Sequence, residues 1–163
     1  MQAGAGGAIA ALESFPLAVA MRHELWLYPI VEIAHISGFV VLVGSIVALD
    51  LRLLGLSRGL SVSLLTRHVV PWSLAALLVI VPTGLLMFIA HASDLLTNRA
   101  FQLKLALILL AGINAALFHT TVYRSVAQWD RDRRVPTGAR LHAAASLALW
   151  FGVLACGRLL AYV

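Results

Sequence analysis

The sequence has few charged residues and almost no cysteine. Only 12% of its 163 residues are charged, and Cys156 is the single cysteine. One cysteine excludes an internal disulfide and any CxxC redox or zinc motif. No stretch alternates apolar and polar residues over the length that a membrane-spanning strand needs, so a transmembrane barrel is not expected.

Apolar residues make up 61% of the chain, and the mean hydropathy is +0.94. This is far above a soluble domain, in which about half of the residues are apolar. Four apolar segments, residues 25–49, 69–90, 105–122 and 143–163, each approach the roughly 20 residues of a spanning helix. The sequence therefore predicts an all-α integral membrane protein, a single four-helix bundle domain in the lipid bilayer.

The basic residues predict how this bundle is oriented. Most arginines fall in the two connections 50–68 and 123–142, which the positive-inside rule places in the cytoplasm, so both termini face outward. The net charge of +5 follows from this topology, and no nucleic-acid partner is expected. The expected location is the bacterial inner membrane, crossed several times.

The first residues, Met1 to Ala11, lack the basic start of a signal peptide, so no cleaved signal is expected. Leu12 to Arg22 is expected to form a short helix at the outer interface. In the second span, Pro71 is expected in the first turn, and Pro82 is expected to kink the helix.

The first span carries two costly groups, Glu32 and His35, about one helical turn apart. Ionisable residues within a membrane mark functional sites unless they are partnered. Depth along the helices predicts an outer layer with Met87, His91, Lys104 and Cys156. At about 1.5 Å per residue, Lys104 and His119 are roughly 22 Å apart in depth and cannot share a small site.

Three interpretations of the outer layer remain open. A b-type haem needs a nitrogen or sulfur ligand, small residues and cations near its propionates, which His35, Gly38 and Lys104 could supply. Copper would use the softer donors His35, Met87, His91 and Cys156. In the third interpretation Glu32 pairs with Lys104, and the polar residues only fix helix register in an anchor or assembly subunit.

Three more histidines lie toward the cytoplasmic side. His68 and His142 are expected near the headgroups, where imidazoles are tolerated. His119 is the best candidate ligand of a second haem, although solvated or hydrogen-bonded histidines are the simpler interpretation. Asn114 is expected to form hydrogen bonds between helices.

Short motifs resemble the CopD-like superfamily, which includes copper-resistance D proteins, HemJ-type protoporphyrinogen oxidases and uncharacterised four-helix bacterial families. The resemblance covers about residues 25–163. It rests on His35, Gly38 and Gly44 in the first span, Thr83-Gly84 in the second, and Phe101-x-x-Lys104 and Phe118-His119 in the third. The segment Asp50-Leu51-Arg52-Leu53-Leu54-Gly55 makes one uncharacterised family the most similar.

In HemJ-type members a first-span histidine and a third-span lysine are essential and associated with haem b, and His35 and Lys104 are similar to those positions. The chain lacks the aromatic and arginine-rich first-helix ending of these members, which argues against porphyrinogen oxidation. It also lacks the Met/His-rich outer loop of copper-resistance D proteins, which argues against copper uptake.

Residues and resemblance together predict a haem b protein, in which His35 is the axial ligand, Lys104 or His91 its partner, and Glu32 a supporting carboxylate. It would be an electron-transfer protein or a component of a haem-dependent oxidoreductase. Expected partners are a quinone, a periplasmic redox or copper protein, a second copy of the chain or a larger complex.

Overall fold

The computed structural model describes residues 2–131, 133–160 and 162, with side chains from residue 7 onward. In this part of the chain the secondary structure is helical, without strands. Four helices are long and apolar enough to cross a membrane: α3 (Leu27–Leu54), α4 (Val62–Ala90), α6 (Arg99–Thr120) and α7 (Thr137–Leu159). The protein is thus a multi-pass helical membrane protein by length and composition.

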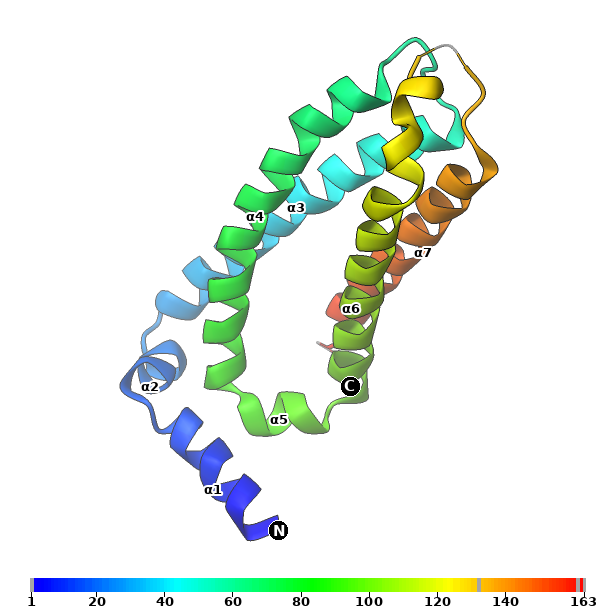
Figure 1. Ribbon diagram of the computed structural model, residues 1–163. Coiled ribbons are helices and arrows are strands. Elements are labelled where there is room, and N and C mark those ends of the chain that lie inside the picture. The colour runs from blue at the N-terminus through cyan, green and yellow to red at the C-terminus, as the bar shows by residue number, and fades with distance from the viewer. Residues whose placement is uncertain (1, 132, 161, 163) are drawn as a thin grey trace.

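Shorter helices connect or precede the long ones. Helices α1 (Gln2–Glu13) and α2 (Pro16–His23) come before α3, α5 (Ala92–Thr97) joins α4 to α6, and the 3₁₀ helix η1 (Val122–Gln128) follows α6. Figure 1 shows α1, α2 and α5 at one end of the molecule, here called the α5 end, and η1 at the opposite end, the η1 end. The expected helix Leu12 to Arg22 is divided between α1 and α2. The helical conformation is interrupted at Ser14 and Phe15, and Pro16 begins a new helix.

The long helices extend beyond the predicted apolar runs. Helix α3 continues through Asp50 and Arg52 to Leu54 and ends at Gly55, whose φ of 109° is left-handed. The N–H of Leu56 then bonds to the carbonyl of Leu51, the arrangement that closes many helices at glycine. The helix therefore ends at the left-handed Gly55 and not at the charged residues Asp50 and Arg52. Residues 161 and 163 of the predicted fourth span lie outside the described residues.

Helix α4 begins earlier than the sequence analysis expects. Ser61 precedes it, and the Ser61 hydroxyl accepts a hydrogen bond from the N–H of Leu64, which satisfies one free donor of the first turn. Pro71 therefore lies inside the helix and not in its first turn, and Pro82 lies inside it as well. The helix bends along its length (Figure 1), as proline within a helix favours.

The four long helices pack in the spatial order α4, α3, α7, α6. Helix α3 packs against both α4 and α7, and α7 packs against α6, whereas among the described residues the backbones of α4 and α6 do not approach each other. Figure 1 shows the α3/α4 and α6/α7 pairs close together at the η1 end and apart toward α5.

All four long helices contribute to one core at the η1 end. Its buried residues come from α3, α4, α6, α7 and the connection after η1: Leu49, Leu53, Val62, Val69, Phe118, Trp129, Val135, Ala139 and Ala143. This core fixes the two helix pairs relative to each other.

Arg52 ties the two connections at the η1 end together. Its side chain is only 2% exposed and donates hydrogen bonds to the carbonyls of Leu60, Arg58 and Asp130. The Asp130 carboxylate in turn accepts from the hydroxyl of Ser61 and from the N–H and hydroxyl of Ser63. Although burial raises the pKa of Asp130, these hydrogen bonds outweigh it and hold the pKa below its usual value.

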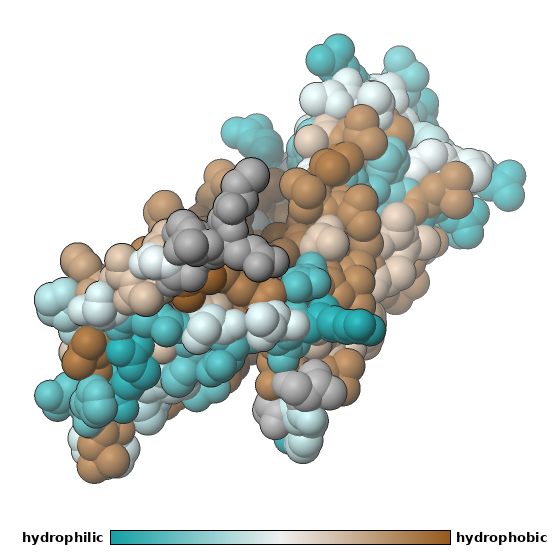
Figure 2. All heavy atoms as spheres, turned by 90° about the horizontal axis from the view of Figure 1, so that it is seen from below, coloured by the Kyte–Doolittle hydropathy of each residue, from teal (hydrophilic) through white to brown (hydrophobic). Residues whose placement is uncertain are grey.

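The α5 end is held by two polar anchors. The N–H and the hydroxyl of Ser93 both donate to Glu13 at 2.7 Å, and these bonds hold the pKa of the Glu13 carboxyl below its usual value. Arg22 donates to the carbonyls of Ala90 and Glu13. Seen from this end, hydrophilic side chains lie beside the apolar flanks of the helices (Figure 2).

Candidate functional site

His35 lies on α3 and faces α4. Its Nδ1 is 3.1 Å from the carbonyl oxygen of Ile80 and 3.0 Å from the hydroxyl oxygen of Thr83. A carbonyl oxygen can only accept, so Nδ1 carries the proton, and the Thr83 hydroxyl, which donates to Val79 at 2.6 Å, can accept from the same N–H. Nε2 is then unprotonated and presents its lone pair.

Two glycines let α3 and α4 approach closely at this point. A Cβ on Gly84 would lie 3.1 Å from Cε1 of His35 and 3.6 Å from its Nδ1, so Gly84 leaves room for the imidazole. A Cβ on Gly38 would lie 2.8 Å from a side-chain carbon of Ile80. Small residues at such crossings allow close backbone packing within a membrane, and here they fix the position of His35.

Phe39 connects His35 to the second helix pair. Its ring centroid is 5.3 Å from that of His35 and 6.2 Å from that of Trp150 on α7, and the Nζ of Lys104 on α6 lies 5.5 Å from it. A cation over an aromatic face is attracted by the negative face of the ring. Phe39 thus lies next to the imidazole of His35, the indole of Trp150 and the ammonium of Lys104, which belong to three different helices.

Lys104 also lies against α7. A Cβ on Gly157 would be 3.6 Å from Nζ of Lys104, and the neighbouring Cys156 is buried. The structure therefore brings His35, Lys104 and Cys156 to the same region of the bundle. We call His35, Phe39, Gly84 and Lys104 the His35 site.

Glu32 is not part of this arrangement. Its side chain is exposed on α3, and within the described chain Lys104 forms no ion pair with it, because the ammonium lies over Phe39. The predicted supporting role of Glu32 stays a prediction.

Met87 and His91 lie further toward the α5 end. Met87 packs against the cluster of Met21, Val31 and Ala90, and the ring of His91 meets Tyr28 edge to face at 5.8 Å. The described residues contain no group of three or more His, Cys, Asp or Glu side chains that could hold a metal ion. The donors predicted for copper are thus divided between two places.

The histidines near the η1 end have different partners. The Nδ1 of His142 is 2.7 Å from Oδ1 of Asn114, while Nδ2 of Asn114 donates to the His142 carbonyl, which confirms the predicted interhelical bond of Asn114. His119 is exposed and bonds through Nδ1 to Ala115 of its own helix, and His68 is exposed. These three histidines do not converge on one another through any hydrogen bond within the described residues.

A buried carboxylate was missed by the sequence analysis. Asp50 is 5% exposed, and its side chain forms a hydrogen bond with that of Ser146 on α7. The sequence predicted Asp50 in the cytoplasmic connection 50–68, because charged residues follow an apolar run. The same is true of Arg52, and the available signal was their position within the helical repeat of Leu49 and Leu53.

The fold and the His35 site together define a helical membrane protein with a half-buried, oriented imidazole between α3 and α4. Residues 28–163 match the model described as "Family of unknown function (DUF6644)", and the chain belongs to this family. No curated protein and no solved structure matches the chain. The relationship to the CopD-like superfamily stays a prediction.

Proposed function

We propose that the protein binds one b-type haem in a bacterial inner membrane, with Nε2 of His35 as the iron ligand. The orientation of His35 supports this proposal most directly. Histidines that bind metals commonly donate their other ring N–H to a carbonyl or carboxylate, which fixes the tautomer and the ring direction. Nδ1 of His35 bonds to the Ile80 carbonyl in this way.

The surrounding residues fit a haem. Gly84 leaves room for the imidazole beside α4, Phe39 provides an apolar aromatic wall, and the ammonium of Lys104 would neutralise a propionate. The backbones of α4 and α6 do not approach each other in the described residues, and side chains such as Phe39 and Trp150 join the two helix pairs near this site. Bound haem would supply one-electron redox chemistry, and the protein would exchange electrons with a membrane quinone or a periplasmic partner.

Haem is preferred to copper because of where the donors lie. Met87 and His91 are displaced along α4 from Gly84, with His91 about 10 Å away at 1.5 Å per residue. Cys156 lies beside Lys104 on the other helix pair. One oriented imidazole suits an axial haem ligand, whereas Cu(I) requires several soft donors at one point.

The arginines support the proposed orientation. The η1 end and its adjacent helix ends carry most of them: Arg52, Arg58, Arg67, Arg124, Arg131, Arg133, Arg134 and Arg140. The positive-inside rule places this end in the cytoplasm, so both termini and α5 face the periplasm. Helices α1 and α2 would then lie at the outer membrane interface.

The test is the absorption spectrum of the protein purified in detergent from haem-sufficient cells. We expect a Soret band that is absent in His35→Ala and retained in His68→Ala, the matched control, because His68 is exposed at the η1 end. A protein without a Soret band, or with one unchanged in His35→Ala, would rule out this function. Metal analysis of the same samples reports copper independently.

A further inference from the structure

A cavity at the α5 end lies outside the His35 site. It has a volume of about 530 Å³, which is within the range of small-molecule sites. Residues of α2, of the turn into α3 and of the end of α4 line it: Met21, Arg22, His23, Glu24, Tyr28 and His91. In the proposed orientation this cavity opens at the outer membrane interface.

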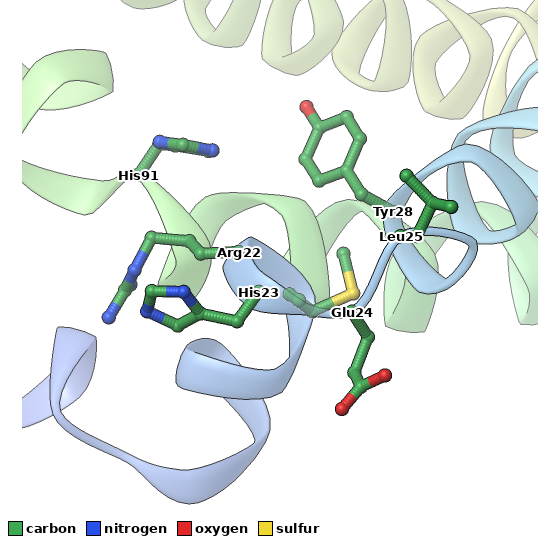
Figure 3. A pocket seen from close by; sticks show the side chains of 7 residues that line it. Arg22, His23, Glu24, Leu25, Tyr28 and His91 are labelled. Atoms are coloured by element: carbon green, nitrogen blue, oxygen red, sulfur yellow. The ribbon is translucent and has the colours of Figure 1, made fainter.

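The cavity combines the rings of Tyr28 and His91 with apolar and charged side chains. Tyr28 and His91 form an edge-to-face pair at 5.8 Å, and Figure 3 shows both rings on the side of the cavity away from Glu24. The ring nitrogens of His91 form no hydrogen bond within the described chain, so they are available to a ligand. Such a wall suits a flat ring that carries hydrogen-bonding oxygens.

The charges in the cavity disfavour a phosphate group. Arg22 is the cation, but its Nη1 and Nη2 already donate to the carbonyls of Ala90 and Glu13. Glu24 adds a carboxylate to the lining, which would repel an anionic lipid headgroup. A neutral ring is therefore a better ligand than a phospholipid headgroup.

The cavity and the His35 site share two helices. Tyr28 lies seven residues before His35 on α3, and His91, the residue directly after α4, lies seven residues after Gly84. Two helical turns, about 10 Å, therefore separate the ring pair from the His35 site along both helices. A redox-active ring in the cavity would lie close to the proposed haem.

We propose that this cavity binds the headgroup of a quinone, with His91 hydrogen-bonded to a quinone oxygen and Tyr28 against the ring. Electron transfer from the bound hydroquinone rests on the proposed haem function, whereas binding of the quinone headgroup does not. One hydroquinone would reduce the ferric haems of two protein molecules to ferrous haems, become a quinone and release two protons at the outer surface.

Binding is tested without haem. We expect decylubiquinone to quench the tryptophan fluorescence of the His35→Ala protein in detergent, because Trp26 is two residues from Tyr28. Adding His91→Leu should raise the half-quenching concentration about tenfold through loss of one hydrogen bond. His91→Gln, which keeps a hydrogen-bonding group, should stay within about threefold of the parent, and His68→Leu should leave the concentration unchanged.

Equal quenching in all of these variants would overturn the inference, and so would full displacement of decylubiquinone by phosphatidylglycerol, which would assign the cavity to a lipid. If His91→Leu does not fold, as size-exclusion chromatography would reveal, Tyr28→Leu takes its place with the same expected loss. With haem present, anaerobic reduction by decylubiquinol should be about tenfold slower in His91→Leu while the Soret band is retained. A band that is missing in every protein, together with quenching that depends on His91, would reject the haem and keep the quinone site.

Discussion

At the η1 end the four long helices share one core, whereas toward α5 the two helix pairs meet through scattered aromatic side chains. The shared core contains Leu53 and Phe118 and is closed by Trp129 from the connection. Toward α5, Phe39 contacts Trp150, and Phe88 stacks on Phe101 with ring centroids 5.9 Å apart. The shared core thus joins the four helices at the η1 end, whereas the cavity lined by Tyr28 and His91 lies at the α5 end.

Polar groups also differ between the two halves. At the η1 end, Arg52, Asp130 and Asn114 form hydrogen bonds with protein partners. Toward α5, His35 uses only Nδ1 on protein, and the ring nitrogens of His91 have no hydrogen-bond partner in the described chain. Both halves therefore keep hydrogen-bonding groups without a protein partner, because the buried Oδ2 of Asp50 near the η1 end has none within the described residues either.

Arg52→Met should give the largest effect, because it removes the donor shared by three carbonyls at the η1 end. Hydrogen bonds made by a charged group contribute about 1.5–3 kcal/mol each, so we expect a loss of about 3 kcal/mol or more. Thermal unfolding in detergent measures this loss. Arg67→Met, an exposed arginine on α4, is the control, and equal destabilisation by both substitutions would contradict the role of Arg52.

Asn114→Leu should have the next largest effect. It removes two hydrogen bonds between α6 and α7, to the ring and the carbonyl of His142, which together should contribute about 1–2 kcal/mol. Thr120→Val is the control, because the Thr120 hydroxyl donates to the carbonyls of Ala116 and Leu117 within α6. The comparison of unfolding midpoints should separate the two variants, and a Thr120→Val midpoint as low as that of Asn114→Leu would argue against an interhelical contribution.

Gly84→Ala tests the half toward α5. The added Cβ would lie 3.1 Å from Cε1 of His35 and displace the imidazole. We expect haem to be retained about tenfold less tightly, about 1.4 kcal/mol, with little change in unfolding. Gly44→Ala on α3 meets no atom within 4 Å and should bind haem normally. Normal haem titration of Gly84→Ala would show that the imidazole tolerates the methyl group.

The smallest expected effects are on the unfolding midpoint at acidic pH. The pKa of Asp130 is lowered in the folded protein, so its contribution to stability is complete above an unfolded pKa of about 4 and is lost as the pH falls through the folded value. Asp130→Asn should therefore flatten the fall in unfolding midpoint below about pH 4.

Glu13→Gln offers the matching test at the α5 end. The pKa of Glu13 is lowered in the same direction by Ser93, but the carboxyl is exposed, so we expect a weaker flattening than in Asp130→Asn. Midpoints measured from pH 3 to pH 6 compare the two variants. A stronger effect of Glu13→Gln would reverse the proposed order of the two ends.

The long helices could be predicted from the sequence because each apolar run has the length that a bilayer demands. The common depth of His35 and Lys104 could be predicted as well, since distance along a helix is fixed by its rise. Helix rotation and pairing could not be predicted, so the bond from His35 to Ile80 and the central place of Phe39 were missed. Phe39 lies four residues after His35, on the same face of α3, which was the available signal.

Boundaries were less predictable than spans. Asp50 and Arg52 follow an apolar run and look solvated, yet the fold buries both within the last turns of α3. Their burial depends on Ser146 of α7 and on the carbonyls of distant connections, which no local pattern reveals. Glu32 is the opposite case. It lies one helical turn from His35 within an apolar run, yet its side chain is exposed.

The most direct test of the account is the Soret band of three purified proteins: the wild type, His35→Ala and His119→Ala. His35 is oriented by α4 in the half toward α5, whereas His119 is exposed near the η1 end and bonds to its own helix. We expect a band in the wild type and in His119→Ala and none in His35→Ala. A band that survives in His35→Ala or disappears in His119→Ala would contradict it.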